Sequence, residues 1–199
     1  KQFPVRFERR IYLDAHQPTF HLNYRLTNLA SKRLDLIWGI HPLFTISPHH
    51  RLELPPGKMD IALSSEEKFG NTGQRYDWPF LETPNGVTDM RIMPSMDVKG
   101  FAGHYCTQPG DNWFTLTDTA KGVAIKMVYP PEVFRSLWFW QSFGGWRDLY
   151  HLAVEPWVGY PVRLDDAVRA GNHRSLAGYE QLEYTVTVIV YSGLSNVLG

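Results

Sequence analysis

The sequence predicts an all-β protein in which antiparallel sheets pack face to face as a β-sandwich. Runs of alternating polar and apolar residues recur along the chain, and glycine and proline clusters separate them. Only one short segment, residues 164–170, has helical character, and Gly171 stops it. No repeat or linker is visible, so we expect a single domain over residues 1–199.

The first half of the chain contains three predicted strands and one irregular region. Residues 5–13 are strand-like, and residues 19–27 alternate cleanly between apolar and polar side chains. A turn then leads into a strand expected over residues 34–46. Residues 64–96 are polar, contain proline and lack a clear period, which predicts long loops.

The second half is more regular. Strands are expected at residues 113–117, 123–129, 135–141 and 182–191, the first two joined as a hairpin. Alternation in the third places Trp138 and Trp140 on one face. The last has apolar residues at every even position, which indicates one buried face. These patterns alone do not distinguish a large sandwich from a jelly roll or a lectin-type sandwich.

Composition narrows the class of partner. Lys+Arg and Asp+Glu number 20 each, so the chain has no overall field that would attract nucleic acid or an anionic membrane surface. A small, neutral or mildly polar molecule is the expected partner. Cys106 is the only cysteine, which excludes an internal disulfide, and no run of about 18 apolar residues or signal-peptide pattern is present. We therefore expect a cytoplasmic protein.

Glu155 is the first candidate for chemistry, because residues 138–160 set this carboxylate among four tryptophans. If residues 152–155 form a strand, Glu155 lies at its end, where Pro156 would stop the pairing. Indole rings that shield a carboxylate raise its pKa, which suits a general base near neutral pH. The alternative is an ordinary ion pair between Glu155 and Arg147 or Arg163.

Three short motifs resemble one known family. Val154-Glu155-Pro156 is similar to a "hydrophobic-Glu-Pro" strand, and residues 176–180 resemble an "L-x-P-G-E" turn with Ala177 in place of the usual proline. Upstream, Thr27-Asn28 and residues 38–44 (WGIHPLF) are similar to a "T-N … W-G-x-H-P-x-F" element. This ordered set resembles the aldose 1-epimerase (galactose mutarotase-like) family, whose fold is a large β-sandwich often called a supersandwich.

The resemblance implies an isomerase of carbohydrate metabolism that interconverts sugar anomers without a cofactor. Glu155 would be the catalytic base and His41 the catalytic acid, a role that suits histidine because it titrates near neutrality. Relatives usually carry roughly a further third of a domain upstream, which supplies an arginine and a second active-site histidine. The chain is therefore expected to be the C-terminal two thirds of such a domain, lacking the N-terminal strands.

Further residues are candidates for holding the sugar. Trp146 and Trp157 flank turns near Glu155 and suit stacking on a pyranose, and His151 could line the same cleft. Arg75 and Asp77 suit recognition of hydroxyl groups, and Arg75 could also grip a phosphate or sulfonate group on the sugar. A surface ion pair between Arg75 and Asp77 explains that cluster almost as well.

Two other groups of residues are considered as a metal site and as a nucleophilic pair, and neither is favoured. His49 and His50 point to opposite faces if they lie on a strand, so no metal site is predicted there. His104 and Cys106 are two residues apart and lack a third group to orient them, which disfavours a nucleophilic pair.

The runner-up function is a non-catalytic carbohydrate-binding module on the same fold. Such a module has no need of an acid and a base on opposite sides of one sugar ring. The distance between His41 and Glu155 therefore discriminates, and about 5–8 Å within one cleft is expected for the enzyme.

Overall fold

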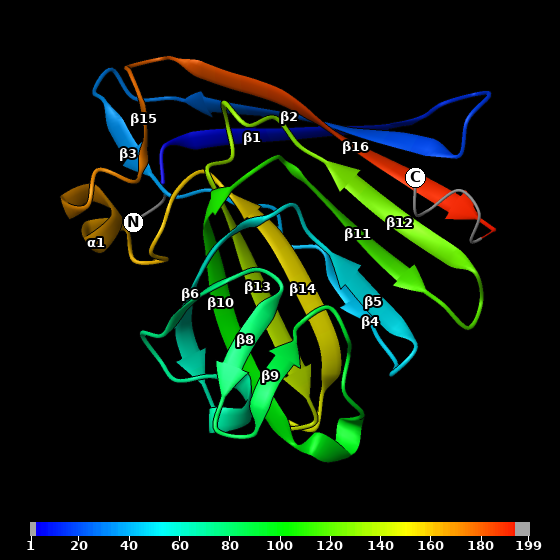
Figure 1. The fold of residues 1–199 in the computed structure, drawn as a ribbon. Coiled ribbons are helices and arrows are strands. Elements are labelled where there is room, and N and C mark those ends of the chain that lie inside the picture. Colours follow the sequence, from blue (N-terminus) through cyan, green and yellow to red (C-terminus); the bar gives the residue numbers. More distant parts are fainter. Residues whose placement is uncertain (1–2, 194–199) are drawn as a thin grey trace.

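Two six-stranded sheets, antiparallel throughout, pack face to face in the computed structural model, which describes residues 3–193 (Figure 1). The first sheet has the order β1 (Val5–Leu13), β2 (Thr19–Asn28), β16 (Gln181–Ser192), β12 (Val123–Val128), β11 (Trp113–Asp118) and β5 (His50–Glu53). The second has the order β4 (Leu43–Thr45), β14 (Tyr150–Trp157), β13 (Ser136–Phe143), β10 (Gly100–Pro109), β6 (Gly57–Ser64) and β7 (Arg75–Asp77). The predicted all-β sandwich is confirmed.

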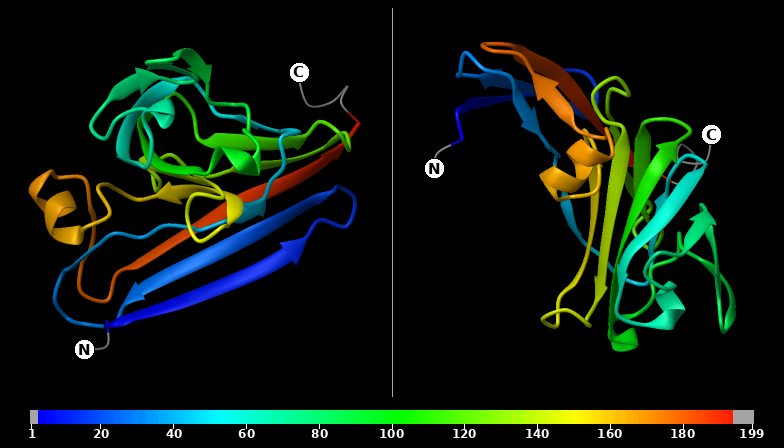
Figure 2. Two further views of the ribbon diagram at one scale, coloured as in Figure 1. Left: turned by 90° about the horizontal axis from the view of Figure 1, so that it is seen from below. Right: turned by 90° about the vertical axis from the view of Figure 1, so that its left-hand side faces the viewer.

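Smaller elements close the ends of the sandwich. β3 (Leu34–Leu36) pairs with β15 (Arg174–Leu176), β8 (Phe80–Thr83) pairs with β9 (Gly86–Asp89), and 3₁₀ turns lie at Glu67–Phe69 and Met96–Val98. The short helix α1 (Leu164–Arg169) lies beside β3 and β15 at one end of the molecule, close to the predicted residues 164–170 (Figure 2).

Alternation along the strands divides the second sheet into two faces. Phe139 and Leu152 are fully buried between the sheets, as are Phe114 and Leu52 from the first sheet. The neighbouring residues Trp138 and Glu155 point to the opposite face, which we call the outer face of the second sheet. Burial of the apolar side chains between the two sheets supplies the main driving force for packing the sheets together.

Two regions differ from the prediction. Residues 34–46 form two short strands rather than one, because the chain leaves β3 and joins the edge of β14 only from Gly39 onward. Residues 64–96 contain β7, β8 and β9 instead of long loops. Strands of three or four residues are too short to show a period in sequence, which explains why the prediction was wrong.

Two long strands, β6 and β10, were not predicted at all. β10 is buried on both faces along most of its length, so its side chains do not alternate between apolar and polar. The other long strands were predicted to within two or three residues of their ends.

Candidate active site

His41, in the segment between β3 and β4, lies opposite Glu155 of β14. Thr45 pairs with His151, Leu43 pairs with Ala153, and the bridge between Gly39 and Trp157 continues the same antiparallel register. The backbone N–H of Ile40 also donates to the carbonyl of Pro156 at 3.0 Å. This register brings His41 Nε2 to 3.4 Å from Glu155 Oε1.

Glu155 is not at the end of its strand. Pairing continues through Pro156 to Trp157, opposite Leu137 and Ser136 of β13, so the expectation that Pro156 stops the strand is wrong. Proline is tolerated here because its carbonyl still accepts a hydrogen bond from Ile40. The extra pairing holds the Glu155 backbone on both sides.

The environment of Glu155 favours its protonated form. Its side chain is only 3% exposed, and this burial raises its pKa to about 7. The charge of His41 and the Trp157 indole N–H, which donates to Oε2 at 3.2 Å, oppose the shift without cancelling it. A carboxylate with this pKa exchanges a proton readily near neutral pH.

The alternative ion pairs for Glu155 are wrong. Arg163 pairs with Asp166 at 3.5 Å, and the Arg147 guanidinium lies over the Trp146 ring at 4.8 Å from its centre. The partner of the buried carboxylate is His41, whose side chain is 63% exposed.

Gly39 explains part of the W-G-x-H pattern. A Cβ at this position would lie 2.4 Å from Cδ2 of Trp157, so only glycine lets the indole rest against the backbone. The same indole is the one that donates to Glu155. Gly39 thus holds Trp157 where its N–H reaches the carboxylate.

Replacing Gly39 with alanine is expected to push the Trp157 indole off the backbone and break its hydrogen bond to Glu155. Because that bond lowers the pKa of Glu155, the pKa should move further upward. Overpacking should also cost about 1–3 kcal/mol of stability. Thermal melts and an NMR titration of the Glu155 carboxyl measure both effects, and an unchanged titration would contradict this role of Gly39.

Aromatic rings form the floor of the outer face next to Glu155. Trp138 lies directly across from Glu155 and packs against Tyr105, with ring centres 4.4 Å apart and the rings tilted by 51°. Gly103 makes room for Trp138, since a Cβ there would lie 2.4 Å from the indole. The floor is an aromatic surface beside a carboxylate, an arrangement suited to packing against a sugar ring.

Trp146 and His151, both predicted to contact the sugar, form a second group with Trp140 on the same face. Trp140 donates from Nε1 to His151 Nε2 at 2.9 Å, and Trp146 packs edge-on against both rings. His151 lies four residues along β14 from Glu155, so this group flanks the His41–Glu155 pair without touching it. Burial, together with the charge of His41, lowers the pKa of His151.

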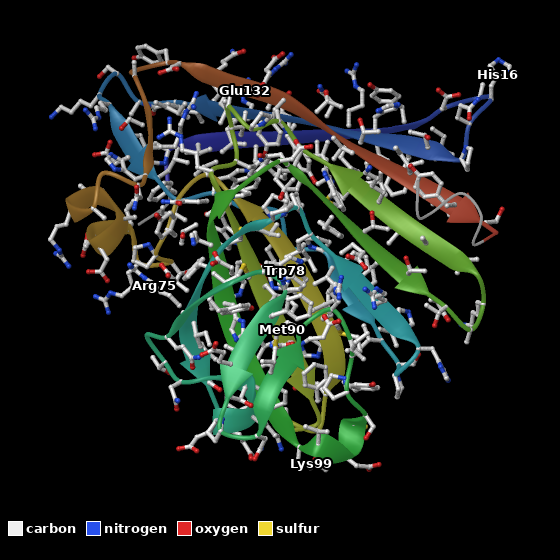
Figure 3. All side chains as sticks on the ribbon, in the orientation of Figure 1. His16, Arg75, Trp78, Met90, Lys99 and Glu132 are labelled. Atoms are coloured by element: carbon white, nitrogen blue, oxygen red, sulfur yellow. The ribbon has the colours of Figure 1, made fainter. Side chains whose placement is uncertain are left out.

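Arg75 and Asp77 lie at the far edge of the sheet, on β7 (Figure 3). The predicted ion pair between them is wrong. Arg75 Nε instead contacts Asp60 Oδ1 at 2.9 Å, and Asp77 Oδ1 contacts Lys58 Nζ at 2.6 Å. The two β6 residues, Asp60 and Lys58, were missed because β6 itself was not predicted.

His104 and Cys106 face the interior and are not a reactive pair. Tyr76 OH lies 2.9 Å from His104 Nδ1, and full burial lowers the pKa of His104 to about 3. Burial raises the pKa of the Cys106 thiol to about 11, which keeps it protonated and unreactive.

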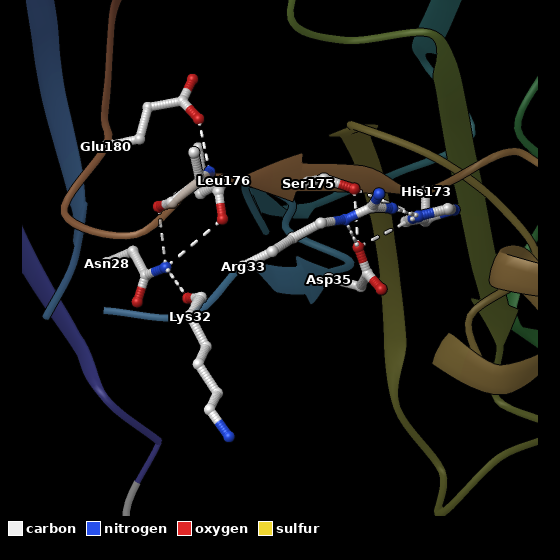
Figure 4. Close-up of polar contacts among 9 residues, drawn as sticks. Asn28, Lys32, Arg33, Asp35, His173, Ser175, Leu176 and Glu180 are labelled. Carbon is white, nitrogen blue, oxygen red and sulfur yellow. Dashed lines mark hydrogen bonds and ion pairs between the residues drawn. The ribbon is translucent and has the colours of Figure 1, made fainter. Parts of the chain in front are cut away.

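The remaining motif residues serve the fold. Asn28 Nδ2 donates to the carbonyls of Lys32, Leu176 and Ala177, and a Glu180 carboxylate oxygen accepts the backbone N–H of Ala177 (Figure 4). Asn28 and Glu180 therefore join two turns at the end of the sandwich.

Residues 3–193 contain neither a cluster of metal-ligating side chains nor a membrane-spanning helix. Within residues 3–193, no group of three or more His, Cys, Asp or Glu side chains could hold a metal ion. No helix in that range is long and apolar enough to cross a membrane.

Solved structures share this fold. A provisionally named aldose 1-epimerase from Klebsiella pneumoniae superposes with a TM-score of 0.73 at 14% identity, over 96% of this chain and 47% of its own. A provisionally named aldose 1-epimerase from Escherichia coli K12 gives 0.68 at 17% identity, over 94% and 60%. A TPR-domain containing protein from Parabacteroides distasonis gives 0.71 at 10% identity, over 98% and 32%.

The fold is that of the galactose mutarotase-like proteins, as the motifs predicted. The chain spans between about a third and three fifths of the length of the three structures above. No protein-family model matches the sequence, and no curated protein matches it. The likeness at these identities concerns the fold alone, and the site must be judged by its own geometry.

Proposed function

We propose that the protein interconverts the anomers of a sugar by acid–base ring opening, with Glu155 as the base and His41 as the acid. The observation that supports this most is the contact between a buried carboxylate, its pKa raised to about 7, and an exposed imidazole 3.4 Å away. An aromatic floor lies beside the pair. A binding module has no use for a carboxylate kept poised in this way.

The proposed reaction needs two proton transfers and no redox step. Glu155 removes the proton of the C1 hydroxyl while His41 donates one to the ring oxygen, and the bond between C1 and that oxygen breaks. The open aldehyde rotates about the bond between C1 and C2, and the two residues reverse their roles on closure. Each transfer by a positioned group is worth about 10²–10⁴ in rate.

The separation of the pair differs from the expected 5–8 Å. At 3.4 Å the two groups touch, so a ring can enter only if one of them moves. Glu155 is held on both sides by pairing, whereas His41 lies outside the strands and is 63% exposed. The proposal therefore requires the imidazole to turn outward when sugar binds.

Exchange between the α and β anomeric signals in NMR saturation-transfer spectra tests the proposal. A panel of neutral hexoses, hexose phosphates and sulfonated hexoses should include at least one sugar whose exchange rises in proportion to protein concentration. Ring stacking observed without any rise in exchange would favour the carbohydrate-binding module. Catalysis by buffer is subtracted with protein-free samples.

The pH dependence follows from the state of Glu155. Because burial raises its pKa to about 7, the base is protonated and inactive in acid, and kcat/KM should rise as pH increases through about 7. A rate that is flat between pH 5 and 8 would exclude Glu155 as the base.

A further inference from the structure

We infer that the second sheet carries another saccharide subsite, so that the substrate is a reducing sugar of two or more units. This inference rests on the proposed function, with the reducing end at His41 and Glu155. The subsite is a cavity of about 630 Å³, a size typical of small-molecule sites. It is lined by Lys58, Asp60, Arg75, Tyr76, Asp77, Thr107, Gln108, Tyr160 and Asn172.

The cavity lies in line with the His41–Glu155 pair. Register places Glu155, Trp138, Tyr105, Asp60 and Arg75 in one row across five strands, all on the outer face. Asp60 is three strands from Glu155, roughly 14 Å at ordinary strand spacing. This separation exceeds one pyranose ring, so a monosaccharide bound at Glu155 would leave the cavity unused.

Aromatic contacts connect the two places. The Trp138 ring packs at a tilt against Tyr105, and Tyr105 packs against Tyr160, a lining residue, with ring centres 5.9 Å apart. C1 and C4 lie at opposite ends of a pyranose ring. A substituent on O4 would therefore leave the reducing unit on the side away from C1, along the row toward the cavity.

The charges of the cavity favour a neutral ligand. Lys58 and Arg75 are each paired with a carboxylate, Asp77 at 2.6 Å and Asp60 at 2.9 Å, so the four charges cancel. A phosphate or sulfonate would face two carboxylates as well as two cations. Sugar hydroxyl groups, which both donate and accept, match the paired charges and the amides of Gln108 and Asn172.

The ion pairs are suited to recognition more than to stability. The side chains of Arg75, Lys58 and Asp77 are 82%, 63% and 73% exposed, and exposed pairs contribute little to the free energy of unfolding. Substitutions here should leave the fold intact. A change in ligand preference can then be attributed to the cavity.

The test compares maltose and cellobiose with glucose and glucose 6-phosphate, in both anomer exchange and binding. In wild type, kcat/KM for at least one disaccharide should exceed that for glucose by about tenfold, the effect of one or two added hydrogen bonds. The double variant Arg75→Ala/Asp60→Ala should reduce that ratio to near one. The matched control is Arg25→Ala, an exposed ion-paired arginine on β2 of the other sheet, which should leave the ratio unchanged.

Binding separates failure of the subsite from failure of the catalytic proposal. NMR titration of Glu155→Gln measures affinity without turnover, and the disaccharide should again bind about tenfold more tightly than glucose. Equal affinities for disaccharide and glucose would overturn the subsite even if anomers exchange. A preference for glucose 6-phosphate that disappears with Arg75 would also overturn it. Tighter disaccharide binding without any exchange would support the subsite and reject the catalytic proposal.

Discussion

Replacing Glu155 with glutamine is expected to reduce anomer exchange by about 10²-fold or more while sugar binding survives. Glutamine keeps the shape of the side chain and an oxygen that can accept the Trp157 N–H, but it cannot take a proton. Exchange and binding are both read from NMR. Near-wild-type exchange would rule out Glu155 as the base.

The same variant carries a second, independent expectation for stability. The folded pKa of Glu155, about 7, is raised above its ordinary value of 4.5, so the folded state holds a proton that the unfolded state has lost between those values. The contribution of Glu155 to stability is therefore fully present below about pH 4.5 and is lost as pH rises to about 7. At pH 8, Glu155→Gln should be more stable than wild type by roughly 1–3 kcal/mol.

Chemical denaturation at pH 5 and pH 8 measures this difference. Glu183→Gln serves as the control, because Glu183 is an exposed carboxylate on β16 of the other sheet. Its substitution should change stability little at either pH. A Glu155→Gln variant that is destabilised at pH 8 would show that the carboxylate is a structural partner and that burial does not penalise its charge.

Sequence alternation predicted most clearly the strands that have one exposed and one buried face. β2 and β16 alternate over ten and twelve residues, and their period identified both strand and buried face. β10 is buried on both sides, so its sequence shows no alternation. β7, β8 and β9 have only three or four residues each, too few to show a period.

Only those residues of the candidate site that belong to short sequence motifs could be predicted. Glu155 was singled out by its four tryptophan neighbours in sequence, and His41 by the resemblance of residues 38–44 to the W-G-x-H-P-x-F element. Asp60 and Lys58 had no such mark. Their place comes from the register of β6 with β7 and with β10, which sets Asp60 beside both Arg75 and Tyr105, 15 and 45 residues further along the chain.

The resemblance itself mixes two kinds of residue. Asn28 and Glu180 bind backbone groups of neighbouring turns, and a Cβ at Gly178 would lie 2.1 Å from the carbonyl oxygen of Ser31. These positions are constrained by the fold whatever the protein does. The proposed function rests on His41 and Glu155, so experiments on these two residues decide it.

Replacing His41 with asparagine is expected to abolish most exchange, by about 10²-fold or more, with little change in melting temperature. The melting temperature is compared at pH 5, where Glu155, its pKa raised to about 7, is protonated. The imidazole is itself 63% exposed, so at that pH its removal leaves no buried charge without a partner. Because the charge of His41 lowers the pKa of Glu155, the acidic limb of any residual rate should move to higher pH.

The matched control for this variant is His49→Asn, an exposed histidine in the turn before β5. It should leave rate, pH profile and melting temperature unchanged. Three measurements on the pair of variants separate the possibilities. Loss of rate with a stable fold and a displaced limb supports His41 as the acid. A melting temperature lowered by an amount equivalent to about 1–3 kcal/mol, with a rate that recovers where the protein is folded, would make it a structural residue instead.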